Sequence, residues 1–180
     1  MVTSYFEELL EEAISCADES ESARVAMMNA SRRRQEAIFS LHMEGLPIRQ
    51  VATHIGVSPA VVQAAVKAAK LRRHHLRRRE ERIPYELHVE LSRKLRSDEQ
   101  NLRSIGLRNL DLMQQRQRNP LAQQWINDWR ELLNATLETL DSRMLADDAN
   151  AVEMRQMSPF AGALSEVERL AAIRRATALA

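Results

Sequence analysis

The stretch from Leu46 to Ala69 constrains the fold most, because it predicts two short helices joined by a tight turn. Apolar residues in its first half recur at the spacing of one helix face: Ile48, Val51, Ala52 and Ile55. Gly56 follows at once, and glycine tolerates the positive φ that a sharp helix end requires. Ser58 can then cap a second helix, whose first position suits Pro59 because no hydrogen bond is lost there.

The second predicted helix has an inward apolar face and a different outward face. Its inward residues lie at helical spacing: Val62, Ala65, Val66 and Ala69. The residues left facing outward are mostly small or polar: Ala60, Val61, Gln63, Ala64 and Lys67.

In this pattern the chain resembles the helix-turn-helix family of DNA-binding domains, over about residues 31–73. Ala52 stands where the family needs a small residue, because the two helices touch there. Other positions match those that the family buries: Val51, Ile55, Val57 and Val62. Pro47 departs from the Ser or Thr cap that often starts the first helix. A plain helical hairpin is the alternative interpretation of the same pattern.

The resemblance implies a set of residues in contact with double-stranded DNA. The second helix would enter the major groove by its N-terminal half and present to the bases Ser58, Ala60, Val61, Gln63 and Ala64. Gln63 can pair bidentately with adenine, and the alanines can contact thymine methyl groups. The expected phosphate contacts are basic: Arg49, Lys67, Lys70, Arg72 and Arg73, with Arg32 and Arg33 near the backbone. So few hydrogen-bonding groups predict modest specificity for each subunit, recovered by pairing subunits on two half-sites.

The charge distribution agrees with a nucleic-acid partner. The formal net charge of the 180-residue chain is only +1, but residues 31–83 carry twelve basic and four acidic side chains. Residues 1–30 carry seven acidic side chains and one arginine. A concentrated basic block over this stretch is typical of a nucleic-acid binder.

Composition predicts an all-α protein. Gly and Pro are scarce, long β-branched alternations are absent, and helix-forming residues dominate. We expect a helix-turn-helix domain at residues 1–83, an antiparallel helical hairpin at 84–145, and a linker with a short amphipathic C-terminal helix at 146–180. Within the first domain, we expect an acidic helix that breaks at 18–22 and a second helix from Ser22 to Met43. After Ala69, residues 70–82 either continue the recognition helix toward Pro84 or form a flexible basic arm.

The expected hairpin turns at Asn119-Pro120, a strong stop and restart signal. Its second helix is expected to run to Met144 and to carry a broad apolar face. Acidic and basic residues balance over the hairpin region. We therefore expect it to mediate homo-oligomerisation, with a dimer favoured, through Leu121, Trp125, Trp129, Leu132 and Leu137. The stripe of the N-terminal helix, from Phe6 to Ile14, also needs a partner. Its acidic face is either solvated or folded over the basic block.

The C-terminal helix begins with a capping box at Ser165 and Glu168. Either it or the acidic N-terminal helix is available to a protein partner.

The sequence offers no catalytic residues, no metal site and no cofactor motif. The histidines lack metal-ligand spacing, Cys16 has no second cysteine to pair with, and no phosphate-binding loop is present. No apolar run is long enough to span a membrane, so we expect a cytoplasmic protein. A dimeric transcriptional regulator of a phage, plasmid or bacterium fits best. The alternatives are a DNA-packaging subunit with the layout of phage small terminases and an interaction or inhibitor protein.

Overall fold

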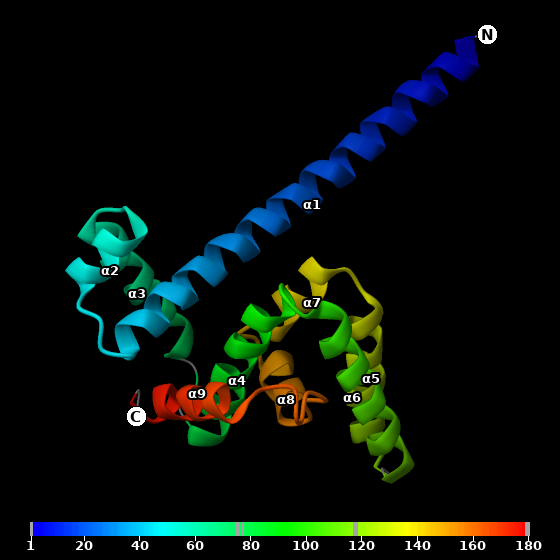
Figure 1. Ribbon diagram of the computed structural model, residues 1–180. Coiled ribbons are helices and arrows are strands. Elements are labelled where there is room, and N and C mark those ends of the chain that lie inside the picture. Colours follow the sequence, from blue (N-terminus) through cyan, green and yellow to red (C-terminus); the bar gives the residue numbers. More distant parts are fainter. Residues whose placement is uncertain (1, 75, 77, 117–118, 179–180) are drawn as a thin grey trace.

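The computed structural model describes residues 2–74, 76, 78–116 and 119–178, and this part of the chain is all α-helical, without strands. Its helices are α1 (Val2–Met43), α2 (Ile48–Ile55), α3 (Pro59–Arg73), α4 (Arg79–Leu95), α5 (Glu99–Arg116), α6 (Pro120–Asn134), α7 (Leu137–Met144), α8 (Ala149–Gln156) and α9 (Glu166–Ala178). Figure 1 shows α2 and α3 beside the C-terminal part of α1, with the other helices grouped around α4.

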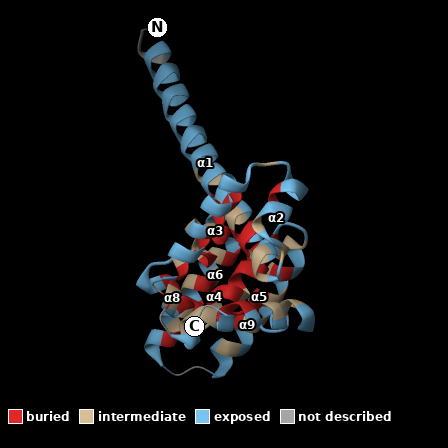
Figure 2. Ribbon diagram, turned by 90° about the vertical axis from the view of Figure 1, so that its left-hand side faces the viewer, coloured by how far each residue is buried: buried red, intermediate tan, exposed pale blue. Residues whose placement is uncertain are grey.

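The first helix is longer than the sequence predicts. α1 runs without interruption from Val2 to Met43, so the expected break at 18–22 is wrong. Residues 18–22 contain neither Gly nor Pro, and therefore nothing in them forces the helix to stop. Arg24 pairs with Glu21 one turn away and supports the helix at this point. The N-terminal half of α1 projects away from the rest of the chain and does not fold over the basic block (Figures 1 and 2).

The two short helices predicted around Gly56 are present as α2 and α3. Gly56 has φ 68° and ψ 37°, and its N–H is directed at the carbonyls of Ala52 and Thr53, which closes α2. The Ser58 hydroxyl accepts a hydrogen bond from the Val61 N–H at 3.4 Å, and Pro59 is the first residue of α3. The predicted inward residues of α3 are confirmed, since all four are buried in a core shared with α1 and α2. Ile55 is the exception on α2, because it is exposed.

α3 ends at Arg73 and does not continue to Pro84; His75 and Arg77 of the expected run lie outside the described residues. α4 begins at Arg79 and contains Pro84, so the expected domain boundary at 83/84 falls inside a helix. Pro84 has no N–H to donate to the Glu80 carbonyl one turn earlier. The Gln156 side-chain amide donates to that carbonyl instead, at 2.8 Å.

The largest apolar core lies in the C-terminal half. α5 and α6 lie side by side (Figure 1), and the predicted restart at Asn119-Pro120 is confirmed, with the Asn119 side chain accepting from the Leu121 N–H at 3.0 Å. α6 ends at Asn134, and Thr136 caps a separate helix, α7, so the predicted single helix to Met144 is wrong.

The expected linker is part of this core. It contains α8, and Met154 and Phe160 pack against the residues of α4 to α7. The predicted capping box of α9 is confirmed: the Ser165 N–H donates to Glu168 at 2.7 Å, and the Glu168 N–H donates to the Ser165 hydroxyl at 3.3 Å. α9 packs along α4, so it is neither a solvated tail nor separate from the rest of the chain.

Candidate nucleic-acid interface

The outward face of α3 is the surface on which the sequence places base contacts. All five of the predicted residues are exposed: Ser58, Ala60, Val61, Gln63 and Ala64. They are exposed because the opposite face of α3 packs against α1 and α2, and 3.6 residues per turn leaves this face outside. Near the N-terminus of α3 the side chains beside Gln63 are the short ones of Ala60 and Ala64. The longer Gln63 side chain can therefore extend its amide beyond them.

Three of the predicted phosphate contacts border this face. Arg49 on α2 and Lys67 and Lys70 on α3 are exposed, and none of the three forms an ion pair with any described acidic residue. An exposed cation without a carboxylate neighbour keeps its full charge for a phosphate group. These three side chains therefore remain available for the role that the sequence predicts.

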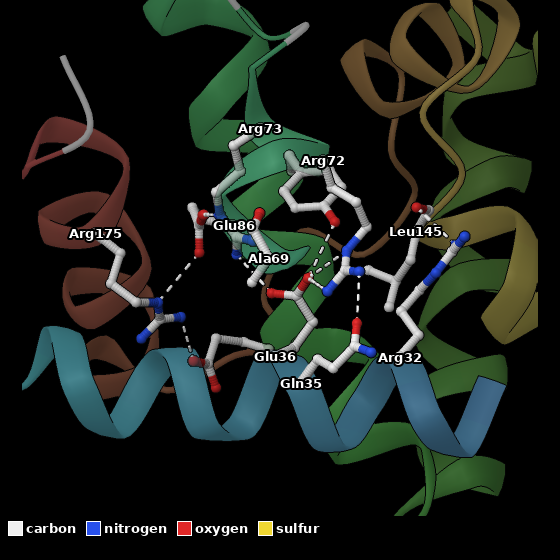
Figure 3. Close-up of polar contacts among 11 residues, drawn as sticks. Arg32, Gln35, Glu36, Ala69, Arg72, Arg73, Glu86, Leu145 and Arg175 are labelled. Atoms are coloured by element: carbon white, nitrogen blue, oxygen red, sulfur yellow. Dashed lines mark hydrogen bonds and ion pairs between the residues drawn. The ribbon is translucent and has the colours of Figure 1, made fainter. Parts of the chain in front are cut away.

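Arg73 does not face outward, which corrects one predicted phosphate contact. Its side chain is 3% exposed, and its guanidinium pairs with Glu36 of α1 at 2.7 Å and with Glu86 of α4 at 2.5 Å (Figure 3). The guanidinium also lies over the Phe39 ring, 4.3 Å from its centroid. Burial alone would lower the pKa of Arg73, but Glu86 and Glu36 together raise it above its ordinary value. Arg73 is therefore a charged part of the interior.

The Arg72 side chain also turns away from the outward face of α3. Its Nε donates to Glu36 at 3.0 Å, and its Nη1 donates to the Gln35 side chain at 2.7 Å (Figure 3). Its second contact is also with α1, so it bends back toward that helix and not toward the outward face of α3. The predicted phosphate contact at Arg72 is therefore corrected as well.

The carboxylates around Arg73 extend the contact to the C-terminal helix. Glu86 also pairs with Arg175 of α9 at 3.1 Å, and Arg175 pairs in turn with Glu90. The Tyr85 hydroxyl donates to Glu36 at 3.4 Å, and burial, followed by the charge of Glu36, raises the pKa of Tyr85 to about 12. We call this set the buried ion-pair network: Glu36, Arg72, Arg73, Glu86, Glu90 and Arg175. It joins α1, α3, α4 and α9, and the sequence analysis did not predict it.

The arginines on α1 before the network are also held within the chain. Arg32 donates to the Leu145 carbonyl at 3.0 Å, and Arg33 pairs with Asp141 of α7. Asp141 is buried and accepts a second hydrogen bond from Ser92. These contacts dock α1 on α7. The Arg33 charge is matched by Asp141, which corrects the predicted phosphate contact at Arg33, whereas Arg32 is half-buried and donates to a neutral carbonyl, so its phosphate contact stays a prediction.

Exposed basic residues also occur at positions that the sequence analysis did not select. Arg78 and Arg79 stand at the start of α4, and Arg34 lies on α1. The density of arginines in residues 77–79 was the signal that could have identified the first two.

The predicted oligomer interface on α6 and α7 is largely internal. Trp129 is 1% exposed and donates from its indole nitrogen to the Met154 carbonyl at 2.9 Å, so it cannot lie on an interface between subunits. Three of the other predicted residues are half-buried against the same core: Trp125, Leu132 and Leu137. Leu121 alone among the five is an exposed apolar side chain.

Metal and membrane features are absent from the part of the chain that the structure describes. No group of three or more His, Cys, Asp or Glu side chains there could hold a metal ion. The helices in the same ranges include none with a long enough apolar segment to cross a membrane. Comparison of the chain with family models, curated proteins and solved structures found no match.

Proposed function

We propose that this protein is a non-enzymatic, sequence-specific DNA-binding regulator of the helix-turn-helix kind, and that α3 reads the major groove. The observation that carries the proposal is the outward face of α3. It exposes Gln63 between small side chains, and Lys67 and Lys70 stand unpaired on the same face. Arg49 adds a third unpaired cation from α2. On such a surface the Gln63 amide can hydrogen-bond to a base edge, and the surrounding Arg49, Lys67 and Lys70 can bind phosphate groups.

The N-terminus of α3 supplies a further phosphate site. Ser58 and Ala60 are exposed, and a helix N-terminus attracts anions through its dipole and its free N–H groups. Pro59 has no N–H and the Val61 N–H donates to Ser58, so the Ala60 N–H and the Ser58 hydroxyl are the groups that would hold the phosphate. A phosphate held there would fix how far α3 enters the groove. Gln63, which lies about one and a half turns further along α3, would then reach the base edges.

A single α3 offers few hydrogen bonds to the bases, so we propose that two subunits bind paired half-sites. Each half-site would then contribute its own modest discrimination. Dimeric proteins of this kind read half-sites about one helical turn apart, or at multiples of that distance. The proposed homo-oligomer is accordingly a dimer.

The test is a selection from random duplexes at physiological salt, on full-length protein whose oligomeric state is measured by light scattering. We expect enrichment of two related half-sites, and Gln63→Ala should relax the preference at one position of each. Lys67→Ala with Lys70→Ala should weaken binding to all sequences and reduce the salt slope by about 1.8. Arg108→Ala, an exposed arginine on α5, is the matched control and should leave the slope unchanged.

The outcome against the proposal is equally specific. If no sequence is enriched and binding vanishes as salt rises, the basic surface is a non-specific one. If light scattering gives an assembly of eight or more subunits, the result favours the alternative that the protein is a DNA-packaging subunit that binds DNA through the same face of α3.

A further inference from the structure

The projecting half of α1 has no other element packed against it. Every side chain from Tyr5 to Arg24 is exposed, and Figures 1 and 2 show this part of the helix standing clear of the rest of the fold. In proteins most of the stability of a helix comes from packing an apolar face against a neighbour. A helix of this length that carries exposed apolar residues therefore calls for a partner.

One set of residues on α1 repeats with the alternating three- and four-residue spacing of a coiled coil. Its large members are Phe6, Leu9 and Met27, and its small members are Ala13, Cys16, Ser20, Ala23 and Ala30. We call these eight residues the α1 seam. All eight are exposed. Residues 5–24 contain seven acidic side chains, and none of them falls on the seam. An uncharged heptad repeat in so acidic a segment predicts pairing with another helix.

The α1 seam lies on the side of the helix that faces away from the rest of the fold. Asn29 donates to the Glu138 carbonyl of α7, so its side of α1 is covered. Met27 precedes Asn29 by two residues, which is about 200° around the helix, and it is 67% exposed. A straight helix drifts by about 20° per heptad relative to the repeat, and a left-handed supercoil takes up that drift. A second helix can therefore lie along the whole seam without displacing a contact of this chain.

We propose that the α1 seam pairs with the α1 seam of a second copy, in a parallel coiled-coil dimer. An identical helix carries the identical repeat, so each seam residue meets its own equivalent. The seam and its flanks comprise four residues in each of four heptads, or sixteen residues between Tyr5 and Ser31. At the usual ratio of area to residues, two such surfaces bury about 1,000 Å² in all, the size at which specific interfaces begin. This inference rests on the self-association proposed above and not on the role of α3.

The charges that flank the seam favour the parallel direction. In a parallel pair a flanking residue meets the residue five positions later on the other helix, so Glu19 lies opposite Arg24 of the second copy. Arg24 already pairs with Glu21 of its own helix at 2.7 Å, so the parallel direction is favoured chiefly because no like charges meet beside the seam. An antiparallel pair brings the same flank of both helices together, and Glu12 and Glu19 then face carboxylates of the second copy.

The parallel direction also suits the proposed recognition of two half-sites. The two-fold axis of a parallel pair runs along the coiled coil. Both subunits then place α2 and α3 at the same end of the assembly, as binding to a single duplex requires. An antiparallel pair would place the two α3 helices at opposite ends.

Sedimentation equilibrium on the full-length chain tests whether the seam is used. Leu9→Glu should weaken dimerisation by at least about 100-fold, because one substitution removes an apolar contact from both helices. Ile14→Glu is the matched control, since Ile14 lies on the same helix outside the seam and is 55% exposed, against 46% for Leu9. It should leave the dimer intact. Equal losses in the two variants, or a loss in neither, would overturn the proposal.

Glu19→Lys tests the direction of pairing by the sign of its effect. In the parallel pair the new ammonium group lies opposite Arg24, so dimerisation should weaken by about 10-fold. In an antiparallel pair the change would remove a repulsion between carboxylates, and tighter dimerisation would overturn the proposal. A wild-type chain that stays monomeric would refute both this inference and the proposed self-association. A dimer that responds as expected but selects no DNA sequence would refute the proposed function alone.

Discussion

Replacing Arg73 by alanine separates its structural role from the phosphate contact that the sequence predicts. The substitution leaves Glu36 and Glu86 buried, each with one guanidinium fewer. Removing one partner of a buried ion pair typically costs about 3–5 kcal/mol, because an uncompensated charge stays in the interior. Glu36 keeps Arg72 and Glu86 keeps Arg175, so we expect about 3 kcal/mol, the low end of that range.

Urea unfolding followed by far-ultraviolet circular dichroism measures this loss. With a slope of about 2 kcal/mol per molar, the midpoint for Arg73→Ala should fall by about 1.5 M. Lys67→Ala is the matched control on the same helix, and its exposed side chain predicts a change within about 0.5 kcal/mol. DNA binding should respond in the opposite order: Lys67→Ala should flatten the salt dependence, and folded Arg73→Ala should keep it. A midpoint shift below about 0.3 M for Arg73→Ala, together with a flatter salt slope, would refute the buried ion-pair network.

Three further substitutions test other parts of the fold. Gly56→Ala should destabilise the chain by about 1 kcal/mol, because alanine is strained at φ 68°, and an unchanged thermal midpoint would contradict this. His88 is buried, which lowers its pKa to about 3. Between pH 6.5 and 3 the unfolded state therefore binds a proton that the folded state does not. As the pH falls through this window, the free energy of unfolding should fall by up to about 1.4 kcal/mol per pH unit. The difference between wild type and His88→Gln in urea unfolding across that window should shrink as the pH falls, and a constant difference would mean that His88 does not titrate as described. Trp129→Phe removes the hydrogen bond to the Met154 carbonyl and should cost at least about 1 kcal/mol, whereas no loss in urea unfolding would place the indole N–H in contact with water.

The turn between α2 and α3 was predictable because its determinants are local. Gly56 ends one helix by its own φ, and Ser58 and Pro59 start the next within two residues. None of these effects needs a distant partner. The boundaries of α2 and the inward residues of α3 therefore followed from the sequence alone.

The helical period alone indicates that Arg73 faces inward, whereas its charge favours an exposed position. Arg73 lies four residues after Ala69 and continues the same buried face. What the sequence could not supply was the compensation for its charge. Glu36 and Glu86 lie 37 and 13 residues away, and only the packing of α1 and α4 brings them together.

The linker was missed for a related reason. Residues 146–162 are polar on average, yet Phe160 fills a space beside Trp129, with their ring centroids 5.7 Å apart and nearly perpendicular. Average polarity does not reveal one aromatic side chain that finds a place in a distant core. The length of α1 shows the same limit, because a helix needs no apolar residues to continue through a polar segment such as 18–22.

The buried ion-pair network has a consequence for the order in which a newly made chain matures. Arg175 comes 89 residues after Glu86, so at about 5–20 residues per second the ribosome adds it roughly 4–18 s later. Until then Glu86 has only Arg73 as a partner, because α9, which carries Arg175, has not yet been made. The contacts of Arg175 with Glu86 and Glu90 are therefore the last part of the buried ion-pair network to form on a newly made chain, and α9 is the last helix to join α4.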